Sequence, residues 1–173
     1  PGRAGQDEQA GQTPGPPPGT SPGESPRPPA SVQDATVLVV DDQAEVRKLI
    51  GAILRKRGYN IEFAASGAEA LALAPQVRPD LVLLDIRMPE MDGVEVCRKL
   101  RRMPGLAELP IVIVSGASDW GTRVVCLEAG ADDFLLKPCD PVELRARVDT
   151  VVRLNRFRKL TDERSGREAA QSA

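Results

Sequence analysis

Four apolar runs of the chain end in side chains that could do chemistry together. The first run ends in Asp41 and Asp42, and later runs end in Asp85, Ser115 and Lys137. Carboxylates about 4 Å apart repel each other by about 4 kcal/mol per pair at an effective dielectric constant near 20, so such a cluster needs a cation. Oxygen ligands without His or Cys suit a hard ion such as Mg²⁺. These residues therefore predict a magnesium site.

The chemistry that fits these groups is phosphoryl transfer onto Asp85, which would form an acyl phosphate. A bound Mg²⁺ would shield the carboxylate nucleophile from the incoming phosphate and neutralise charge in the transition state. Lys137 would pair with Asp85 at rest and with a phosphoryl oxygen afterwards. The hydroxyl of Ser115 would donate a hydrogen bond to another phosphoryl oxygen.

Each of these residues also has an ordinary structural explanation. Asp42 could cap the following helix, Asp85 could start a turn through Pro89 and Gly93, and Lys137 could be a solvated charge. Their common position at the ends of successive apolar runs favours the functional interpretation.

The elements that must position these residues alternate along the chain from Thr36 onward. Short, almost purely apolar runs indicate strands covered on both faces, and the segments between them have helical periodicity. Such alternation predicts an α/β fold with a parallel sheet between two helical layers, with ligands bound beyond the carboxyl ends of the strands. The expected strands are 36–40, 59–64, 81–84, 111–114 and 134–136; the expected helices are 43–57, 68–74 (stopped by Pro75), 93–102, 119–129 and one from Pro141, capped by Asp140.

The segments that flank this pattern differ in composition. Gly and Pro supply 15 of the first 29 residues, so residues 1–34 are expected to form a disordered tail or linker. A PxxP ligand through Pro14, Pro17, Pro26 and Pro29 is the alternative. The domain is expected over 35–155, and 156–173 as a helical extension with a disordered polar tail from 161. Val151, Leu154, Phe157 and Leu160 could share one side of that extension, or the segment could be a frayed, solvated helix end.

Composition narrows the class of protein. A net charge of −2 predicts no general attraction to nucleic acid or anionic membranes, and no apolar run approaches the roughly 20 residues that span a bilayer. The absence of His excludes His-dependent catalytic triads and phosphohistidine on this chain. Cys97, Cys126 and Cys139 have no CxxC spacing and are expected to be reduced thiols, so we expect a cytoplasmic location.

The chain resembles the receiver domains of two-component signalling over roughly residues 35–155. The motifs that carry the resemblance are VLVVDD (37–42), DLVLLDIRMPEMDG (80–93), PIVIVSG (110–116) and GADDFLLKP (130–138). The resemblance implies a flavodoxin-like (βα)₅ three-layer sandwich with strand order 2-1-3-4-5. It implies Asp85 as phosphoacceptor, Asp41, Asp42, Asp85 and the backbone carbonyl of Arg87 as Mg²⁺ ligands, Lys137 as phosphate-binding lysine, Ser115 and Phe134 as switch residues, and a cis bond before Pro138.

For function, the resemblance implies a signalling switch rather than a turnover enzyme, with only self-phosphorylation from a phosphodonor and autodephosphorylation. The partners would be a sensor histidine kinase or phosphotransfer protein and a downstream output domain or protein, with no nucleic acid and no membrane. A homodimer through the fourth helix, fifth strand and fifth helix is an arrangement that such domains often use. The side chain of Arg87, where a smaller or polar residue is commoner, is expected to overhang the acyl phosphate and change its lifetime.

Three other functions stand as alternatives to this one. A phosphatase with an aspartyl nucleophile would need a second Asp at the position of Arg87, and a flavin site would need a phosphate loop where the chain has Asp41 and Asp42. A phosphate-independent, receiver-like interaction module is the main alternative.

Overall fold

The computed structural model describes residues 34–116 and 120–171. The tail and PxxP predictions for the segment before Asp34 lie outside these residues. Five strands form one sheet in the order β2-β1-β3-β4-β5, and every neighbouring pair is parallel. The predicted fold class and strand order are confirmed. In chain order the elements are β1 (Thr36–Val40), α1 (Ala44–Arg55), β2 (Asn60–Ala64), α2 (Gly67–Val77), β3 (Leu81–Leu84), α3 (Gly93–Arg102), β4 (Ile111–Ser115), α4 (Trp120–Glu128), β5 (Asp133–Leu136) and α5 (Pro141–Gln171).

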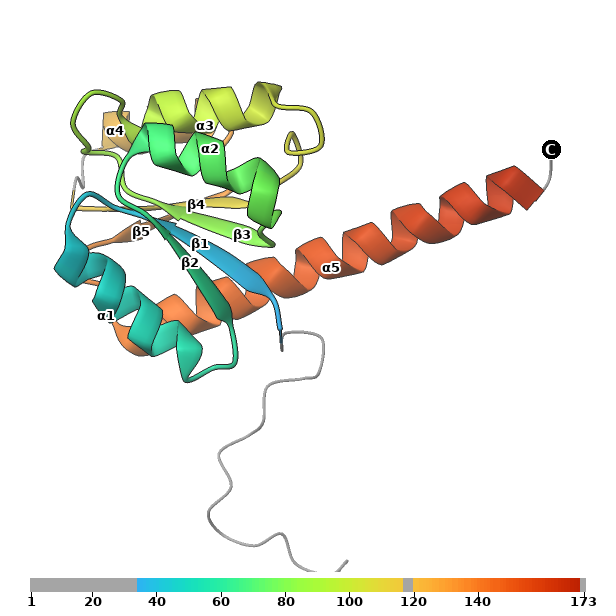
Figure 1. The fold of residues 1–173 in the computed structure, drawn as a ribbon, viewed down its shortest axis with the longest axis horizontal. Helices are drawn as coiled ribbons and strands as arrows, with labels where there is room; N and C mark the ends of the chain where they lie inside the picture. Colours follow the sequence, from blue (N-terminus) through green and yellow to red (C-terminus); the bar gives the residue numbers. More distant parts are fainter. Residues whose placement is uncertain (1–33, 117–119, 172–173) are drawn as a thin grey trace, which may run out of the picture.

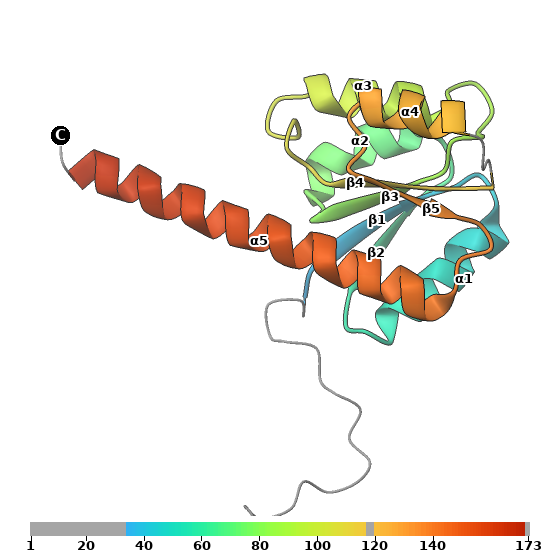
Figure 2. The same ribbon diagram turned by 180° about the vertical axis from the view of Figure 1, so that it is seen from behind.

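The sheet lies between two helical layers, with α2, α3 and α4 on one face and α1 and α5 on the other (Figures 1 and 2). Alternate residues of each strand enter different cores because successive side chains point to opposite faces. In β1, Leu38 and Val40 belong to the core under α2, α3 and α4, whereas Val37 and Val39 belong to the core under α1 and α5. Burial on both faces explains why the inner strands β1, β3 and β4 are mostly apolar runs, whereas the edge strand β2 contains the exposed Asn60 and Glu62.

The second helix is longer than the sequence predicts. The structure continues α2 to Val77, with Pro75 inside it, so the predicted stop before Pro75 is wrong. A proline has no N–H to donate to the preceding turn, and its ring crowds that turn, so it usually ends a helix. Near the end of a helix few residues follow the proline, and the helix can tolerate it there. The helix ends at Arg78, which has a left-handed backbone (φ 45°) and donates its N–H to the carbonyl of Ala74.

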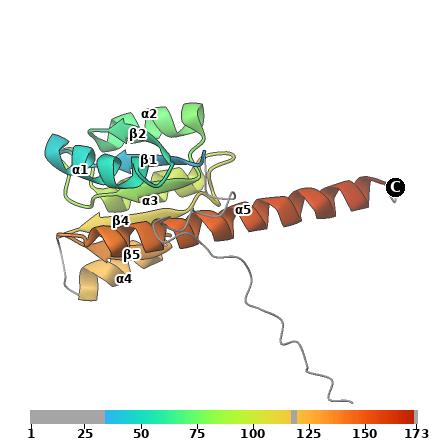
Figure 3. The same ribbon diagram turned by 90° about the horizontal axis from the view of Figure 1, so that it is seen from below.

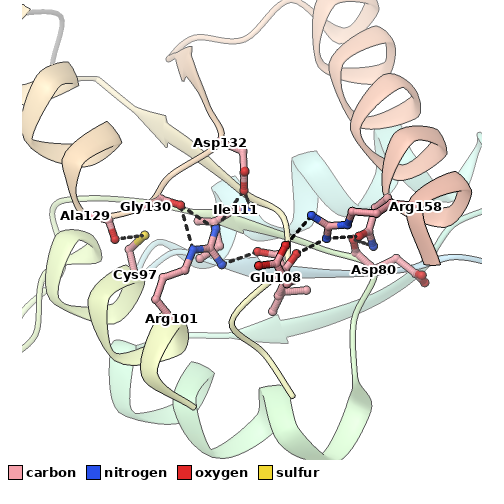
Figure 4. A network of polar contacts seen from close by, with 11 residues as sticks. Asp80, Cys97, Arg101, Glu108, Ile111, Ala129, Gly130, Asp132 and Arg158 are labelled. Atoms are coloured by element: carbon pink, nitrogen blue, oxygen red, sulfur yellow. Dashed lines mark hydrogen bonds and ion pairs between the residues drawn. The ribbon is translucent and has the colours of Figure 1, made fainter. Parts of the chain in front are cut away.

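A network of polar contacts joins loops at the amino-terminal edge of the sheet (Figure 4). Arg101 of α3 donates to the carbonyls of Leu109 (2.6 Å) and Gly130 (2.6 and 3.0 Å), and to the carboxylate of Asp132 (3.0 Å). The same Asp132 oxygen accepts the backbone N–H of Ile111 at 2.8 Å. One side chain thus ties the loops before β4 and β5 to α3 on the side of the domain opposite the carboxyl ends of the strands.

The last helix extends well beyond the sheet. At about 1.5 Å per residue, the 31 residues of α5 span about 46 Å, and its carboxyl-terminal half projects away from the domain (Figures 1 and 3). The structure keeps this segment helical to Gln171, which differs from the prediction of a disordered tail from 161 onward. Within the described ranges, no helix has the length and apolar character needed to cross a membrane.

Candidate functional site: a carboxylate cluster at the carboxyl ends of the strands

The parallel strands bring the predicted carboxylates to one edge of the sheet. Asp41 and Asp85 follow the neighbouring strands β1 and β3, and the N–H of Asp85 donates to the carbonyl of Val40 at 2.9 Å. Asp41, Asp42 and Asp85 each offer a carboxylate oxygen, and these oxygens lie within 4.8 Å of one another. Asp41 and Asp85 are buried and Asp42 is exposed, so the cluster is open to solvent on one side.

Hydrogen bonds fix the orientation of Asp41. One carboxylate oxygen accepts the backbone N–H of Gln43 at 2.9 Å, and the backbone carbonyl accepts Nη1 of Arg47 at 2.7 Å. The amino-terminal cap of α1 is Gln43, and no side chain caps this helix end. Asp42 therefore does not act as the helix cap that the structural alternative required.

Lys137 brings positive charge to the cluster from the end of β5. Its Nζ lies 2.5 Å from Asp41 Oδ2 and 3.4 Å from Asp85 Oδ1. Burial opposes the charge on Lys137, but its hydrogen bond to Asp41 and the charges of Asp85 and Asp41 outweigh burial and raise its pKa. The backbone N–H of Lys137 donates to the carbonyl of Ser115, and the bond to Pro138 is cis, as predicted. Lys137 therefore stays cationic next to both buried carboxylates.

The environment of Asp85 disfavours its charged form. Burial raises the pKa of Asp85, the nearby charge of Lys137 lowers it, and the charge of Asp41 raises it again, with a net rise. A single ammonium group shared between two buried carboxylates thus compensates their charge only in part. A divalent cation among these oxygens would supply the missing positive charge, which is the condition that Mg²⁺ sites with one or two carboxylates meet.

Gly93 is a positioning residue whose role the sequence reasoning missed. A Cβ atom at Gly93 would lie 2.2 Å from the backbone oxygen of Asp85, and the N–H of Gly93 donates to the carbonyl of Ile86 at 2.9 Å. Only a residue without a side chain fits at the start of α3, directly against the backbone that carries Asp85. The sequence offers Gly93 as the last residue of the DLVLLDIRMPEMDG motif, where its only suggested role is in a turn that starts at Asp85.

The predicted switch residues lie on the neighbouring strands β4 and β5. Ser115 ends β4 and is buried, and Phe134 of β5 is buried in the core under α4. The guanidinium of Arg123, from α4, lies 5.3 Å from the centre of the Phe134 ring. In contrast, Arg87 has an exposed side chain in the loop after β3. Its predicted roles, through the carbonyl in metal binding and through the side chain in phosphate lifetime, stay predictions.

The residues fit a bound Mg²⁺ by the chemistry of the donors. Asp41, Asp42 and Asp85 are hard oxygen ligands close enough to share one ion. When bound, Mg²⁺ would supply positive charge that neutralises the negative charge developing during phosphoryl transfer.

Comparisons with known proteins agree with this geometry. The model of the response regulator receiver domain matches residues 37–149. The response regulator PleD of Caulobacter vibrioides is 45% identical over 137 residues, which are 79% of this chain and 29% of that protein. The DNA-binding response regulator MtrA of Mycolicibacterium paratuberculosis is 42% identical over 119 residues, 69% of this chain and 52% of that protein. The chain thus spans about half or less of the length of these curated relatives.

A solved structure gives the same result at the level of the fold. The chemotaxis response regulator CheY4 of Vibrio cholerae superposes with a TM-score of 0.66 at 32% identity, covering 69% of this chain and 99% of that one. The family match covers well over half of the 173 residues, and it includes both the sheet and the carboxylate cluster. The chain therefore belongs to the response regulator receiver domain family of two-component signalling.

Proposed function

We propose that the protein accepts a phosphoryl group on Asp85 from the phosphohistidine of a sensor kinase or phosphotransfer protein. A carboxylate oxygen of Asp85 forms the new P–O bond, and the P–N bond to the donor histidine breaks, so that the donor leaves with its imidazole. The observation that carries the proposal is the contact of Lys137 with both Asp41 and Asp85, inside a cluster whose oxygens lie within 4.8 Å.

Each group has a part in the transfer. Asp41 and Asp42, with the carbonyl of Arg87, would hold Mg²⁺ next to the acceptor. Lys137 already lies 3.4 Å from Asp85, so a small movement would bring its ammonium to a phosphoryl oxygen. Because an ammonium is a compact point charge on a flexible stem, it tolerates the change of partner.

The conformational signal would start at Ser115. Its hydroxyl would turn toward the phosphoryl oxygens, which add about two negative charges and three acceptors. The ring of Phe134 would then enter the space that Ser115 leaves, and Arg123 would lose its contact with that ring. The surface of α4, β5 and α5 carries exposed apolar side chains for a partner to read: Trp120, Val125, Leu127, Leu136 and Val142.

The phosphodonor would approach over α1 and the loop before α5. An apolar groove of about 320 Å³ lies there, lined by residues that include Val46, Leu49, Ile53, Lys137 and Pro138. Leu49 is 63% exposed, although it is a large apolar residue. An apolar helix of the donor would cover this groove and present its phosphohistidine to the cluster.

We propose that the chain is a switch and not a turnover enzyme, so that its own chemistry is limited to self-phosphorylation and slow hydrolysis. Arg87 would tune that hydrolysis; an Arg87→Ala variant should change the rate of phosphate loss, and an unchanged rate would refute this role.

The three free cysteines agree with a cytoplasmic location. The output partner would be a domain or protein that binds the α4–β5–α5 surface.

Intact-protein mass spectrometry tests the proposal. The chain and its Asp85→Ala variant would each be incubated with acetyl phosphate, with Mg²⁺ or with a chelator. We expect the mass of one phosphate to be gained only by the unaltered chain and only with Mg²⁺. If the folded chain gains no phosphate from acetyl phosphate or from a kinase donor, the alternative of a phosphate-independent interaction module replaces the proposal.

A further inference from the structure

Arg47 of α1 reaches back to the residue that follows β1. Its Nη1 donates a hydrogen bond of 2.7 Å to the backbone carbonyl of Asp41, six residues earlier. A guanidinium usually pairs with carboxylates, because its fork of N–H donors matches their two oxygens. Within the part of the chain that the structure describes, the side chain of Arg47 instead bonds only this neutral carbonyl, although Asp41 belongs to a cluster of three carboxylates.

The carbonyl that Arg47 binds belongs to the peptide unit between Asp41 and Asp42. That unit is planar, so a bond that holds its oxygen also restricts the direction in which the chain continues to Asp42. The pairing of the sheet ends at this point, because the N–H of Asp41 still donates to the carbonyl of Ala64 at 3.2 Å, whereas Asp42 lies in a bend before α1. Arg47 thus supplies the donor that a neighbouring strand supplies elsewhere in the sheet.

The two carboxylates on either side of this peptide are held very differently. The Asp41 carboxylate is 3% exposed and accepts from the N–H of Gln43 at 2.9 Å and from Nζ of Lys137 at 2.5 Å. The Asp42 side chain is exposed, and among the described residues no hydrogen bond or ion pair holds its carboxylate. The position of that carboxylate therefore depends on its backbone, which Arg47 restrains through the preceding carbonyl.

We infer that Arg47 is a positioning residue for the Mg²⁺ site and that it favours Mg²⁺ over Ca²⁺; this rests on the proposed function, in which Asp41 and Asp42 hold the ion. Mg²⁺ requires a nearly ideal octahedron of ligands at about 2.0 to 2.1 Å, whereas Ca²⁺ accepts about six to eight ligands at longer distances in flexible arrangements. A restrained peptide between two ligands suits the smaller and stricter ion. Loosening that peptide should therefore weaken the binding of Mg²⁺ more than the binding of Ca²⁺.

The charge of Arg47 alone would have the opposite effect on the metal. A cation beside a metal site repels Mg²⁺, so removing only its charge should strengthen Mg²⁺ binding. Removing a group that orients a metal ligand typically weakens metal binding by about 10 to 100 times. The direction in which the Kd for Mg²⁺ changes in Arg47→Met therefore separates positioning from charge repulsion.

NMR titrations of the whole chain with MgCl₂ and, separately, with CaCl₂ measure both Kd values through the backbone amide signals, among them the N–H of Gln43 that Asp41 accepts. The matched control is Lys48→Met. Lys48 is the next residue of α1, its side chain is exposed, and it contacts no other described side chain through a hydrogen bond or ion pair. This control loses the same charge as Arg47→Met but no hydrogen bond to the cluster.

The expected changes differ between the variants. In Arg47→Met the Kd for Mg²⁺ should rise about tenfold or more, and the Kd for Ca²⁺ should rise less than about threefold. Arg47→Lys keeps the charge but replaces the fork by a single ammonium, so its Kd for Mg²⁺ should lie between those of the unaltered chain and Arg47→Met. In Lys48→Met both values should stay within about twofold, because an exposed charge is screened.

Four results would overturn the inference: no Mg²⁺ binding by the unaltered chain, an unchanged or lower Kd for Mg²⁺ in Arg47→Met, equal losses of Mg²⁺ and Ca²⁺ binding, or the same loss in Lys48→Met. The amide spectra show whether each variant is folded, and if Arg47→Met is not, Arg47→Lys is compared with the control in the same way. The titrations contain no phosphodonor. If Arg47→Met loses affinity for Mg²⁺ while the unaltered chain gains no phosphate, the inference stands and the proposed function fails.

Discussion

Replacing Lys137 by Met should destabilise the protein strongly without Mg²⁺ and much less with it. Lys137 is the ammonium that contacts both Asp41 and Asp85, at 2.5 and 3.4 Å, and those carboxylates are only 2% and 5% exposed as residues. Removing one partner of a buried ion pair leaves an uncompensated charge and costs about 3 to 5 kcal/mol. Because the Lys137 side chain is 22% exposed, we expect the lower end, about 3 kcal/mol.

Thermal unfolding measures this loss. For a domain of this size, 1 kcal/mol corresponds to about 3 to 4 °C, so Lys137→Met should lower the melting temperature by about 10 °C in the presence of a chelator. Mg²⁺ binds the folded state and neutralises the same oxygens, so it should restore a large part of the difference. The experiment therefore tests the electrostatics and the metal site together.

Lys99→Met is the matched control. Lys99 forms an ion pair with Glu95 at 3.0 Å, but both side chains are about half exposed, at 47% and 49%. Exposed pairs of this spacing contribute about 0.3 to 0.5 kcal/mol, so this variant should melt within about 2 °C of the unaltered chain, with or without Mg²⁺. A loss for Lys137→Met that is as small as the control, or that Mg²⁺ leaves unchanged, would refute the account of the cluster.

Three further substitutions test other contacts. Tyr59→Phe removes a 2.6 Å hydrogen bond to the buried carboxylate of Asp149 and should cost about 2 kcal/mol in urea unfolding. Burial, and then the hydrogen bond to Asp149, raises the pKa of Tyr59, so the protonated hydroxyl stabilises the fold fully at every pH below the unfolded-state pKa of about 10. The stability lost in Tyr59→Phe should therefore be the same at pH 6 and at pH 8. A loss that differs between these two pH values would contradict this origin. Gly93→Ala should lower the free energy of unfolding by about 1 to 3 kcal/mol and slow phosphorylation, because the new Cβ would lie 2.2 Å from the carbonyl oxygen of Asp85. An unchanged rate of phosphorylation by acetyl phosphate would disprove the positioning role. Arg101→Met removes the side-chain donor of two backbone carbonyls and the ion pair with Asp132, and it should lower the free energy of unfolding by about 1 to 3 kcal/mol; an unchanged urea midpoint would count against that.

Local patterns were sufficient to predict the strands and the position of the cluster. Strands β1, β3, β4 and β5 are mostly apolar runs with a chemically active residue after them or at their end, and parallel pairing brings those ends together. Asp41, Asp85 and Lys137 were predicted to converge, and they do. The prediction placed Lys137 against Asp85, whereas the structure places its Nζ closer to Asp41 than to Asp85.

Contacts between distant residues could not be predicted in this way. Asn155 reaches Asp80 across 75 residues, and Arg158 reaches Glu108 across 50, so no local pattern announces either pair. The length of α5 was underestimated for a related reason. Its last residues are polar and contain Gly166, which indicates weak helix propensity, while the anchors that start the extension in a fixed direction are tertiary contacts.

The central claim is that the acyl phosphate forms on Asp85, and the most direct test is to locate it. After reaction with Mg²⁺ and acetyl phosphate, hydroxylamine would convert an aspartyl phosphate into a hydroxamate that survives digestion, and peptide fragmentation would identify the modified residue. We predict modification of Asp85 alone, and none when Mg²⁺ is chelated. A modification on Asp41 or Asp42 instead, or the same modification of Asp85 without Mg²⁺, would contradict the account.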